Sequence, residues 1–333
     1  MPSFNAHRRQ SFYRGDLVEV RSATEIAATL DVSGQLDGLP FMPEMASACG
    51  QRFRVFRRAD KTCVEGLGLR RLQDTVFLDG LRCDGAAHDG CERGCLMFWK
   101  EAWLKPASAV PLTPKSGSEV PRAAALNAWV RSLPSRSGDQ YVCQSTALAS
   151  ATTHIPSWDI RHLVREVATR ELTFTMFGQI VVRALVNKLR VLARLSEIGG
   201  IAGDRARNPK GNLSLQPGER VAVRSAADIA ATLDPKGRNQ GLSFEPDMSD
   251  CTGRHYEVEK PVRKIILEQT GRMAHLTNTV TLKGVTCQGL CSKNCPRSNP
   301  IFWREIWLQR SAVGHAPPAP TAKQKTATQA QAL

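Results

Sequence analysis

Hydrophobic and polar positions alternate in several short stretches near the start of the chain. Leu17, Val18 and Val20 follow a Gly-Asp turn in GDLVEVRS, similar alternation recurs in residues 51–58, and residues 74–81 are a further strand candidate. Alternation with a period of two is typical of strands that bury one face. We therefore expect three strands in these places.

Two further segments near these strands carry local signals. Ser22 is followed three residues later by Glu25, a capping box that predicts a short helix. Residues 34–43 are rich in turn formers and predict a loop. The segment FWKEAWL, residues 98–104, predicts a short strand with Trp99 and Trp103 on one face, although a helix would pair the same two residues.

The same pattern occurs twice. Residues 15–31 (GDLVEVRSATEIAATLD) and 218–234 (GERVAVRSAADIAATLD) are identical at twelve of seventeen positions. The offset of 203 holds to Val258 and becomes 204 afterwards, ending with FWKEAWL against FWREIWL. A repeat of this length predicts two copies of one folded unit.

These patterns predict a mixed, mainly β protein of two small barrel-like units joined by a linker and a central helical segment. The opening GD-x-V-x-V resembles the start of Src-homology-3-like and KOW-type barrels, which implies that fold for each unit. The expected boundaries are a disordered N-terminus at 1–14, repeat unit 1 at 15–105, a linker at 106–155, a helical segment at 156–200, a connector at 201–213, repeat unit 2 at 214–310 and a disordered tail at 311–333.

The central segment predicts helix over residues 158–195, broken near Gly178, and residues 177–195 predict an amphipathic helix. Packing on the two units is one interpretation, and binding to an anionic membrane surface or to a partner is another. Packing would bury one stripe and expose another. The stripe expected to be buried is Ile180, Leu185, Leu189 and Leu192, and the stripe expected to be exposed is Arg183, Arg190 and Arg194.

Composition narrows the class of protein. The 333 residues carry 45 basic and 31 acidic side chains, a net charge of +14 that favours anionic partners. No apolar run reaches 18 residues, and residues 1–15 lack an apolar signal core, so we expect a cytoplasmic protein without a spanning helix. A basic strand face is either solvated or a phosphate contact, and its members are Arg52, Arg54, Arg57, Arg58 and Lys61, with Arg70 and Arg71 nearby.

Cysteines give the strongest chemical signal. The segment CDGAAHDGCERGC places Cys83, His88, Cys91 and Cys95 within thirteen residues that include three glycines. Thiolate and imidazole are soft metal ligands, and four of them complete a tetrahedral site. Cys63 is a fifth candidate from a neighbouring strand.

The second repeat has its own cluster, Cys287, Cys291 and Cys295. The remaining cysteines, Cys49, Cys143 and Cys251, are expected to be ordinary buried thiols. Zinc and an iron–sulfur cluster both suit such donors.

One motif in the first cluster resembles that of a known family. CDGAAH resembles the CDGSH iron–sulfur motif, which implies Cys83 and His88 as cluster ligands. One extra residue separates them here, and the upstream C-x-C pair of that family is missing.

The whole chain resembles uncharacterised bacterial proteins with two tandem repeats, through GDLVEVRS, LPFMPEM, FWKEAWL, CPR at Cys295 and FWREIWL. Motifs of nucleotide-binding loops, serine hydrolases and zinc proteases are absent. We expect a metal-stabilised scaffold or accessory module that binds a protein or anionic partner. The alternatives are an iron–sulfur or metal-dependent enzyme or redox accessory protein, and a nucleic-acid-binding protein.

Overall fold

The computed structural model describes residues 11–107, 128–130, 132–156, 158–193, 199–289 and 294–311. The chain divides into two compact units. Unit 1 comprises Met1–Lys188, Arg263–Leu276 and Thr286–Pro300, and unit 2 comprises Leu189–Val262, Thr277–Val285 and Ile301–Leu333. Parts of the second repeat therefore belong to the same compact unit as the first.

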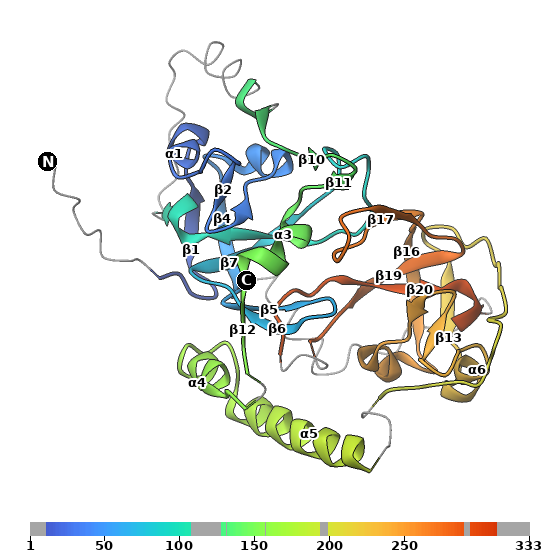
Figure 1. The fold of residues 1–333 in the computed structure, drawn as a ribbon. Coiled ribbons are helices and arrows are strands. Elements are labelled where there is room, and N and C mark those ends of the chain that lie inside the picture. The colour runs from blue at the N-terminus through green and yellow to red at the C-terminus, as the bar shows by residue number, and fades with distance from the viewer. Residues whose placement is uncertain are drawn as a thin grey trace, which may run out of the picture. The chain divides into compact units, whose positions relative to one another are not determined.

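The first repeat forms a five-stranded sheet in the order β8-β7-β4-β1-β9, of which Figure 1 labels β1, β4 and β7. Its strands are β1 (Leu17–Val20), β4 (Arg52–Arg58), β7 (Thr75–Arg82), β8 (Leu96–Lys100) and β9 (Leu104–Pro106). The two edge strands, β8 and β9, are consecutive in the chain. The mainly β, barrel-like architecture predicted from the sequence is confirmed.

The second repeat forms the matching sheet, β20-β19-β16-β13-β21. Its strands are β13 (Arg220–Val223), β16 (His255–Pro261), β19 (Thr279–Thr286), β20 (Pro300–Arg304) and β21 (Leu308–Arg310). The register repeats as well, since Val18 pairs with Phe53 and Val221 pairs with Tyr256, each at the offset of 203. The predicted repeat is confirmed as a structural one.

Short elements complete each repeat. The first has α1 (Ala23–Ala27), the pair β2 (Gln35–Leu36) and β3 (Leu39–Pro40), the 3₁₀ helix η1 (Pro43–Ala48) and the hairpin β5 (Lys61–Val64) and β6 (Gly68–Arg71). The second has α6 (Ala226–Ala230), β14 (Arg238–Asn239), β15 (Leu242–Ser243), η3 (Pro246–Cys251) and the hairpin β17 (Lys264–Ile266) and β18 (Met273–His275). The predicted capping box of Ser22 and Glu25 is present at α1. The segment 34–43, predicted as a loop, includes the two-residue pair β2 and β3.

The FWKEAWL segment is only partly a strand. β8 ends at Lys100, and Glu101–Trp103 form the 3₁₀ helix η2 before β9 begins. The predicted continuous strand is therefore wrong beyond Lys100, because the chain turns there to reach the other edge of the sheet. The second repeat turns identically at η5 (Glu305–Trp307).

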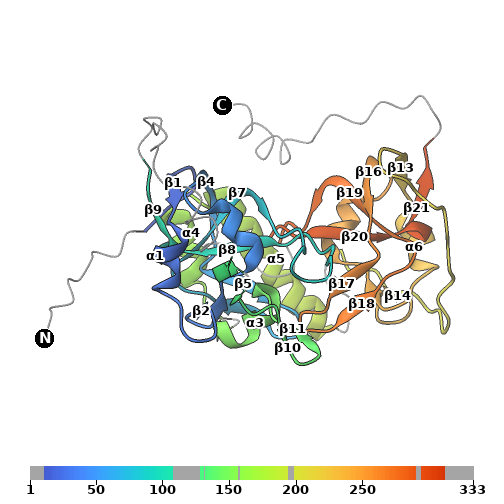
Figure 2. The same ribbon diagram turned by 90° about the horizontal axis from the view of Figure 1, so that it is seen from above.

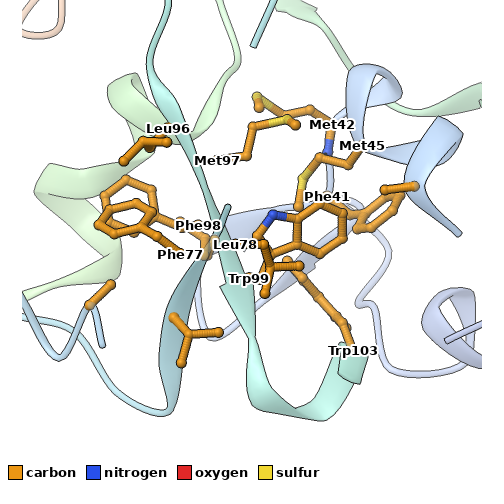
Figure 3. Packing of buried hydrophobic residues seen from close by; sticks show 14 of the residues in the cluster. Phe41, Met42, Met45, Phe77, Leu78, Leu96, Met97, Phe98, Trp99 and Trp103 are labelled. Carbon is orange, nitrogen blue, oxygen red and sulfur yellow. The ribbon is translucent and has the colours of Figure 1, made fainter. Parts of the chain in front are cut away.

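Aromatic side chains of this segment fill the core. Trp99 and Trp103 are fully buried, and Phe41 meets both rings edge-on, with centroids 6.2 and 5.3 Å away. Figure 3 shows Trp99 directed toward Phe41, whereas Phe98 lies on the other side of β8 beside Phe77. Edge-to-face pairs add about 0.5–1.5 kcal/mol each beyond burial. The tryptophans are thus structural.

Residues 132–156 fall largely within the segment predicted as a linker, but they are structured. They form β10 (Arg136–Ser137), β11 (Gln140–Tyr141), the helix α3 (Gln144–Ala151) and β12 (Thr153–His154). Leu148 of α3 is completely buried in the first repeat's core, and β12 extends the β5–β6 hairpin into a three-stranded sheet. Residues 108–127 of the predicted linker lie outside the described residues.

The hairpin of the second repeat completes unit 1. The Tyr141 amide of β11 donates to the Gly271 carbonyl, in the turn of β17–β18, at 2.7 Å. Figure 2 shows β10, β11, β17 and β18 near one another. Unit 1 therefore includes segments of both repeats.

The central segment is helical, as α4 (Arg161–Ala168) and α5 (Phe174–Leu192), but its burial contradicts the prediction. α5 continues through Gly178 and buries no residue, and Leu185, Leu189 and Leu192 are all more than half exposed. The predicted packing of this stripe is wrong, because no described element covers it. Arg194 and Leu195 lie outside the described residues. No helix in the described part of the chain is long and apolar enough to cross a membrane.

Candidate metal centre

The cysteine-rich loop connects β7 to β8 and folds back tightly on itself. The Cys83 amide donates to the Cys95 carbonyl at 2.8 Å, which closes the loop at its base. Gly85 has φ of +72°, and a Cβ there would overlap the backbone of Cys91. Glycine is therefore required at this position, since only it permits so close an approach. Gly289 makes the same approach to Cys295 in the second repeat.

Four thiols and one imidazole line a single cavity of about 30 Å³ in unit 1. Three of the thiols come from the loop, and Cys143 comes from the N-cap position of α3. The cavity volume exceeds the 10–15 Å³ or so that one water-sized sphere needs. Its lining comprises Cys83, His88, Cys91, Cys95 and Cys143, with Met42, Arg93, Gly94, Leu96, Phe98, Gln144, Ser145 and Ile266.

The structure thus assembles the four candidates predicted for the first cluster, Cys83, His88, Cys91 and Cys95, around one cavity. It adds Cys143, which the sequence placed among ordinary buried thiols. No spacing rule points to Cys143, because it lies far along the chain from the others. α3 brings it to the cavity.

Glu44 of η1 is a second donor that sequence reasoning missed. Its Oε1 lies 2.5 Å from His88 Nδ1 and 3.8 Å from Cys83 Sγ. Among the described residues, Glu44, Cys83 and His88 form a group whose donor atoms all lie within 4.8 Å of one another. The other carboxylate oxygen, Oε2, is buried without a hydrogen-bond partner. The sequence carried one signal for Glu44. It is an acidic residue within the otherwise apolar LPFMPEM motif, and the second repeat has an acidic residue, Asp247, at the same position.

His88 is held at both ring nitrogens. Nδ1 faces Glu44, and Nε2 lies 3.0 Å from the Val142 carbonyl. Burial alone would lower the pKa of His88, but the Glu44 carboxylate outweighs it and raises that pKa. Burial likewise opposes ionisation of Glu44, yet its bond with His88 gives a net lowering of the Glu44 pKa.

Three of the thiols lining the cavity, those of Cys83, Cys91 and Cys143, are harder to ionise than a thiol in water. Burial raises the pKa of Cys83, and the nearby Glu44 charge raises it further. Burial also raises the pKa of Cys91 and of Cys143. A thiolate forms there when a cation is present to compensate its charge.

The remaining candidates lie elsewhere. Cys63 on β5 meets Cys295, with the two sulfurs 3.3 Å apart. The hydrogen bond with Cys63 lowers the pKa of Cys295 to about 6, against the effect of burial. Cys287 Sγ accepts from the Gly289 amide at 3.3 Å. Cys291 lies outside the described residues.

A second, larger cavity in unit 1 is lined mostly by charged groups and has a volume of about 510 Å³. Six lining residues are cationic and four are acidic. The cations are Arg57, Arg58, Lys61, Arg71, Arg161 and Arg165, and the acids are Asp60, Asp74, Glu166 and Glu171. A buried carboxylate just outside the lining also pairs with these cations, since Asp159 lies 3.2 Å from Arg71 and 3.0 Å from Arg161, so the positive charge of the lining is largely compensated.

Comparison with known proteins supplies no family: no protein-family model matches the chain, and no curated protein matches it.

Proposed function

We propose that this protein is a metal-stabilised tandem scaffold whose metal centre occupies the thiol-lined cavity of unit 1. One observation carries the proposal: Cys83, Cys91, Cys95, Cys143 and His88 converge on one cavity from two separate chain segments. Soft donors concentrated in this way bind a metal of the zinc or iron class.

The metal would act chiefly on stability. The loop between β7 and β8 carries few apolar side chains, and a bound metal would compensate the charge of its thiolates. Since no preformed site exists in the unfolded chain, metal affinity contributes directly to folding free energy.

The experiment is metal analysis of the full chain, purified without oxygen, followed by thermal unfolding with and without a chelator. Metal present at 100 times its dissociation constant stabilises by about 2.7 kcal/mol. We expect chelation to lower the Tm of unit 1 by about 5–10 °C. Protein that holds no metal, even after incubation with zinc or with iron and sulfide, would exclude this function.

The charged cavity supports an anionic partner for the same scaffold, because it has a ligand-sized volume and its cations Arg161 and Arg165 are largely exposed to solvent. The probe is inorganic pyrophosphate, titrated into the full chain. We expect binding that weakens as salt concentration rises and that Arg71→Ala reduces. Binding of random-sequence RNA with a steep salt dependence would instead favour a nucleic-acid-binding function.

A further inference from the structure

The spacing of the cavity thiols distinguishes one kind of metal centre from another. Two sulfurs bound to one zinc lie no more than about 4.6 Å apart, twice the Zn–S bond of about 2.3 Å. Among the described residues, the three donors within 4.8 Å of one another are Glu44, Cys83 and His88, so no three of the four cavity sulfurs are that close. Four thiols that line one cavity, no three of which meet within that distance, suit a centre with several metal atoms better than a single zinc ion.

His88 contributes to this arrangement without offering an electron pair to the cavity. Its Nδ1 and Nε2 are both engaged, by Glu44 and by the Val142 carbonyl. Val142 immediately precedes Cys143, so the bond from His88 fixes the segment that delivers the fourth thiol. His88 is therefore a positioning residue, and Glu44 in turn orients His88.

Hydrogen-bond donors and cations surround the sulfurs. The Ile266 amide donates to Cys91 Sγ at 3.3 Å, and the Ser145 hydroxyl lies 3.5 Å from Cys95 Sγ. Arg297 is buried and donates to the same Ser145 hydroxyl at 2.8 Å, while Arg93 lines the cavity itself. Donors and positive charge stabilise a cluster whose four thiolates make it negative.

We propose that Cys83, Cys91, Cys95 and Cys143 hold an iron–sulfur cluster in this cavity. The proposal rests on the proposed function, because it specifies the metal centre of that scaffold. On binding, each cysteine loses its thiol proton to solvent, and its sulfur forms one bond to an iron atom. The cysteine sulfur keeps its oxidation state, and ferric iron and hydrogen sulfide supply a 2Fe–2S core with no transfer of electrons, the protons of the sulfide passing to solvent.

The test starts with the full chain purified without oxygen and, where iron is low, reconstituted with ferric iron and sulfide. We expect a brown protein that contains iron and acid-labile sulfide in equal amounts. Cys143→Ser should lose most of its iron, whereas Cys49→Ser should keep it. Cys49 is the matched control because its side chain packs against the same core but does not line the cavity.

Far-UV circular dichroism establishes whether Cys143→Ser folds. If it does not, pulsed electron paramagnetic resonance of the reduced wild-type protein decides the question. Four cysteine ligands predict no nitrogen coupling of a bound histidine. Such a coupling would make His88 a ligand and overturn the assignment of Cys143.

A different result separates this proposal from the one on which it rests. One zinc per chain, lost in His88→Ala and kept in Cys143→Ser, would place a single ion at Glu44, Cys83 and His88. That result would overturn the cluster but leave a metal-stabilised scaffold. Protein that binds neither zinc nor iron would overturn both.

Discussion

Two buried glutamates occupy equivalent positions in the repeats but have different donors. Glu101 accepts from the Phe12 amide at 3.0 Å and from Arg58 Nη1 at 2.7 Å. Glu305 accepts from three successive backbone amides, beginning with Leu213 at 2.6 Å. Each glutamate therefore anchors the segment that precedes its own sheet, one through a charged donor and one through neutral donors.

We expect Glu101→Gln to lower the free energy of unfolding of unit 1 by about 2–3 kcal/mol, because it removes a charged hydrogen bond from buried Arg58. Glu305→Gln should cost unit 2 about 1–2 kcal/mol, since its donors are neutral. Urea unfolding of both variants measures this. Equal losses in the two variants would contradict the role assigned to Arg58.

At this scale the sequence identified only part of the proposed metal centre. Cys83, His88, Cys91 and Cys95 are close in sequence, so their density revealed them. Cys143 and Glu44 come from segments whose proximity depends on the tertiary fold, and no local pattern encodes that. Cys63 lay near enough in sequence to be a candidate, but the fold directs it to Cys295.

Among the elements, the first helix shows how a one-carbon difference alters a cap. Ser22 and Glu25 cap α1 reciprocally, because the Glu25 carboxylate accepts from the Ser22 amide at 2.9 Å. In α6 the shorter Asp228 bonds the Ser225 hydroxyl. The hydroxyl and amide of Ser22 lower the pKa of Glu25 to about 2, from 4.5.

Because the fold lowers the Glu25 pKa, the carboxylate stabilises unit 1 above the unfolded value of 4.5 and loses that effect as pH falls toward 2. We expect Glu25→Ala to cost about 1 kcal/mol at pH 7, the usual magnitude for a cap at an exposed site. Urea unfolding at pH 7 and at pH 3 should show a smaller cost at pH 3. A cost that is the same at both pH values would show that the carboxylate charge is not involved.

α5 illustrates what periodicity cannot decide. Its apolar spacing correctly predicted a helix, but the same spacing suits a helix packed on the core and one that carries its apolar side chains on the surface. Burial depends on whether another element lies opposite, which is a tertiary property. A contact of this helix with a partner or a membrane surface remains a prediction.

We expect Leu185→Gln in α5 to change the free energy of unfolding by no more than about 0.5 kcal/mol, as is usual for exposed positions. Leu148→Ala in α3 should cost about 2–5 kcal/mol, because Leu148 is fully buried. Thermal unfolding of the isolated variants compares the two. A large loss in Leu185→Gln would mean that something packs on α5.

At the scale of the whole molecule, the repeats exchange parts within unit 1. Arg93 of the first repeat's loop donates to the Ile266 carbonyl of the second repeat's hairpin at 2.9 Å. Its counterpart Arg297, at an offset of 204, donates to the Cys63 carbonyl of the first repeat's hairpin at 3.0 Å. Glu268 accepts from Arg297 at 2.7 Å. Comparison of the sequence with itself revealed the two copies. The contacts between the two repeats could not be predicted, because they do not alter the hydrophobic pattern of either repeat.

A fragment of residues 1–193 should therefore fail to form a stable unit 1, because it lacks the hairpin and loop of the second repeat. We expect this fragment to bind more of a hydrophobic dye than the full chain binds. We also expect it to lose the metal that the full chain should retain. Arg297→Ala in the full chain should cost about 3–5 kcal/mol, since Glu268 stays buried without that partner. A fragment that unfolds cooperatively would contradict the exchange.

The exchange also sets an order of events during synthesis. Unit 1 consists of three segments of the chain, and the last segment ends at Pro300. Cys143 leaves the ribosome well before Pro300. At about 5–20 residues per second, the delay is roughly 10–30 s. For most of that interval Ile266 has not been made, so Cys91 lacks the hydrogen bond from its amide. Arg297, in the loop between β19 and β20, is made later still. If the proposed metal centre is correct, the nascent chain presents its thiols to a metal donor before these parts of the second repeat are made, and metal loading would belong to the synthesis of the protein.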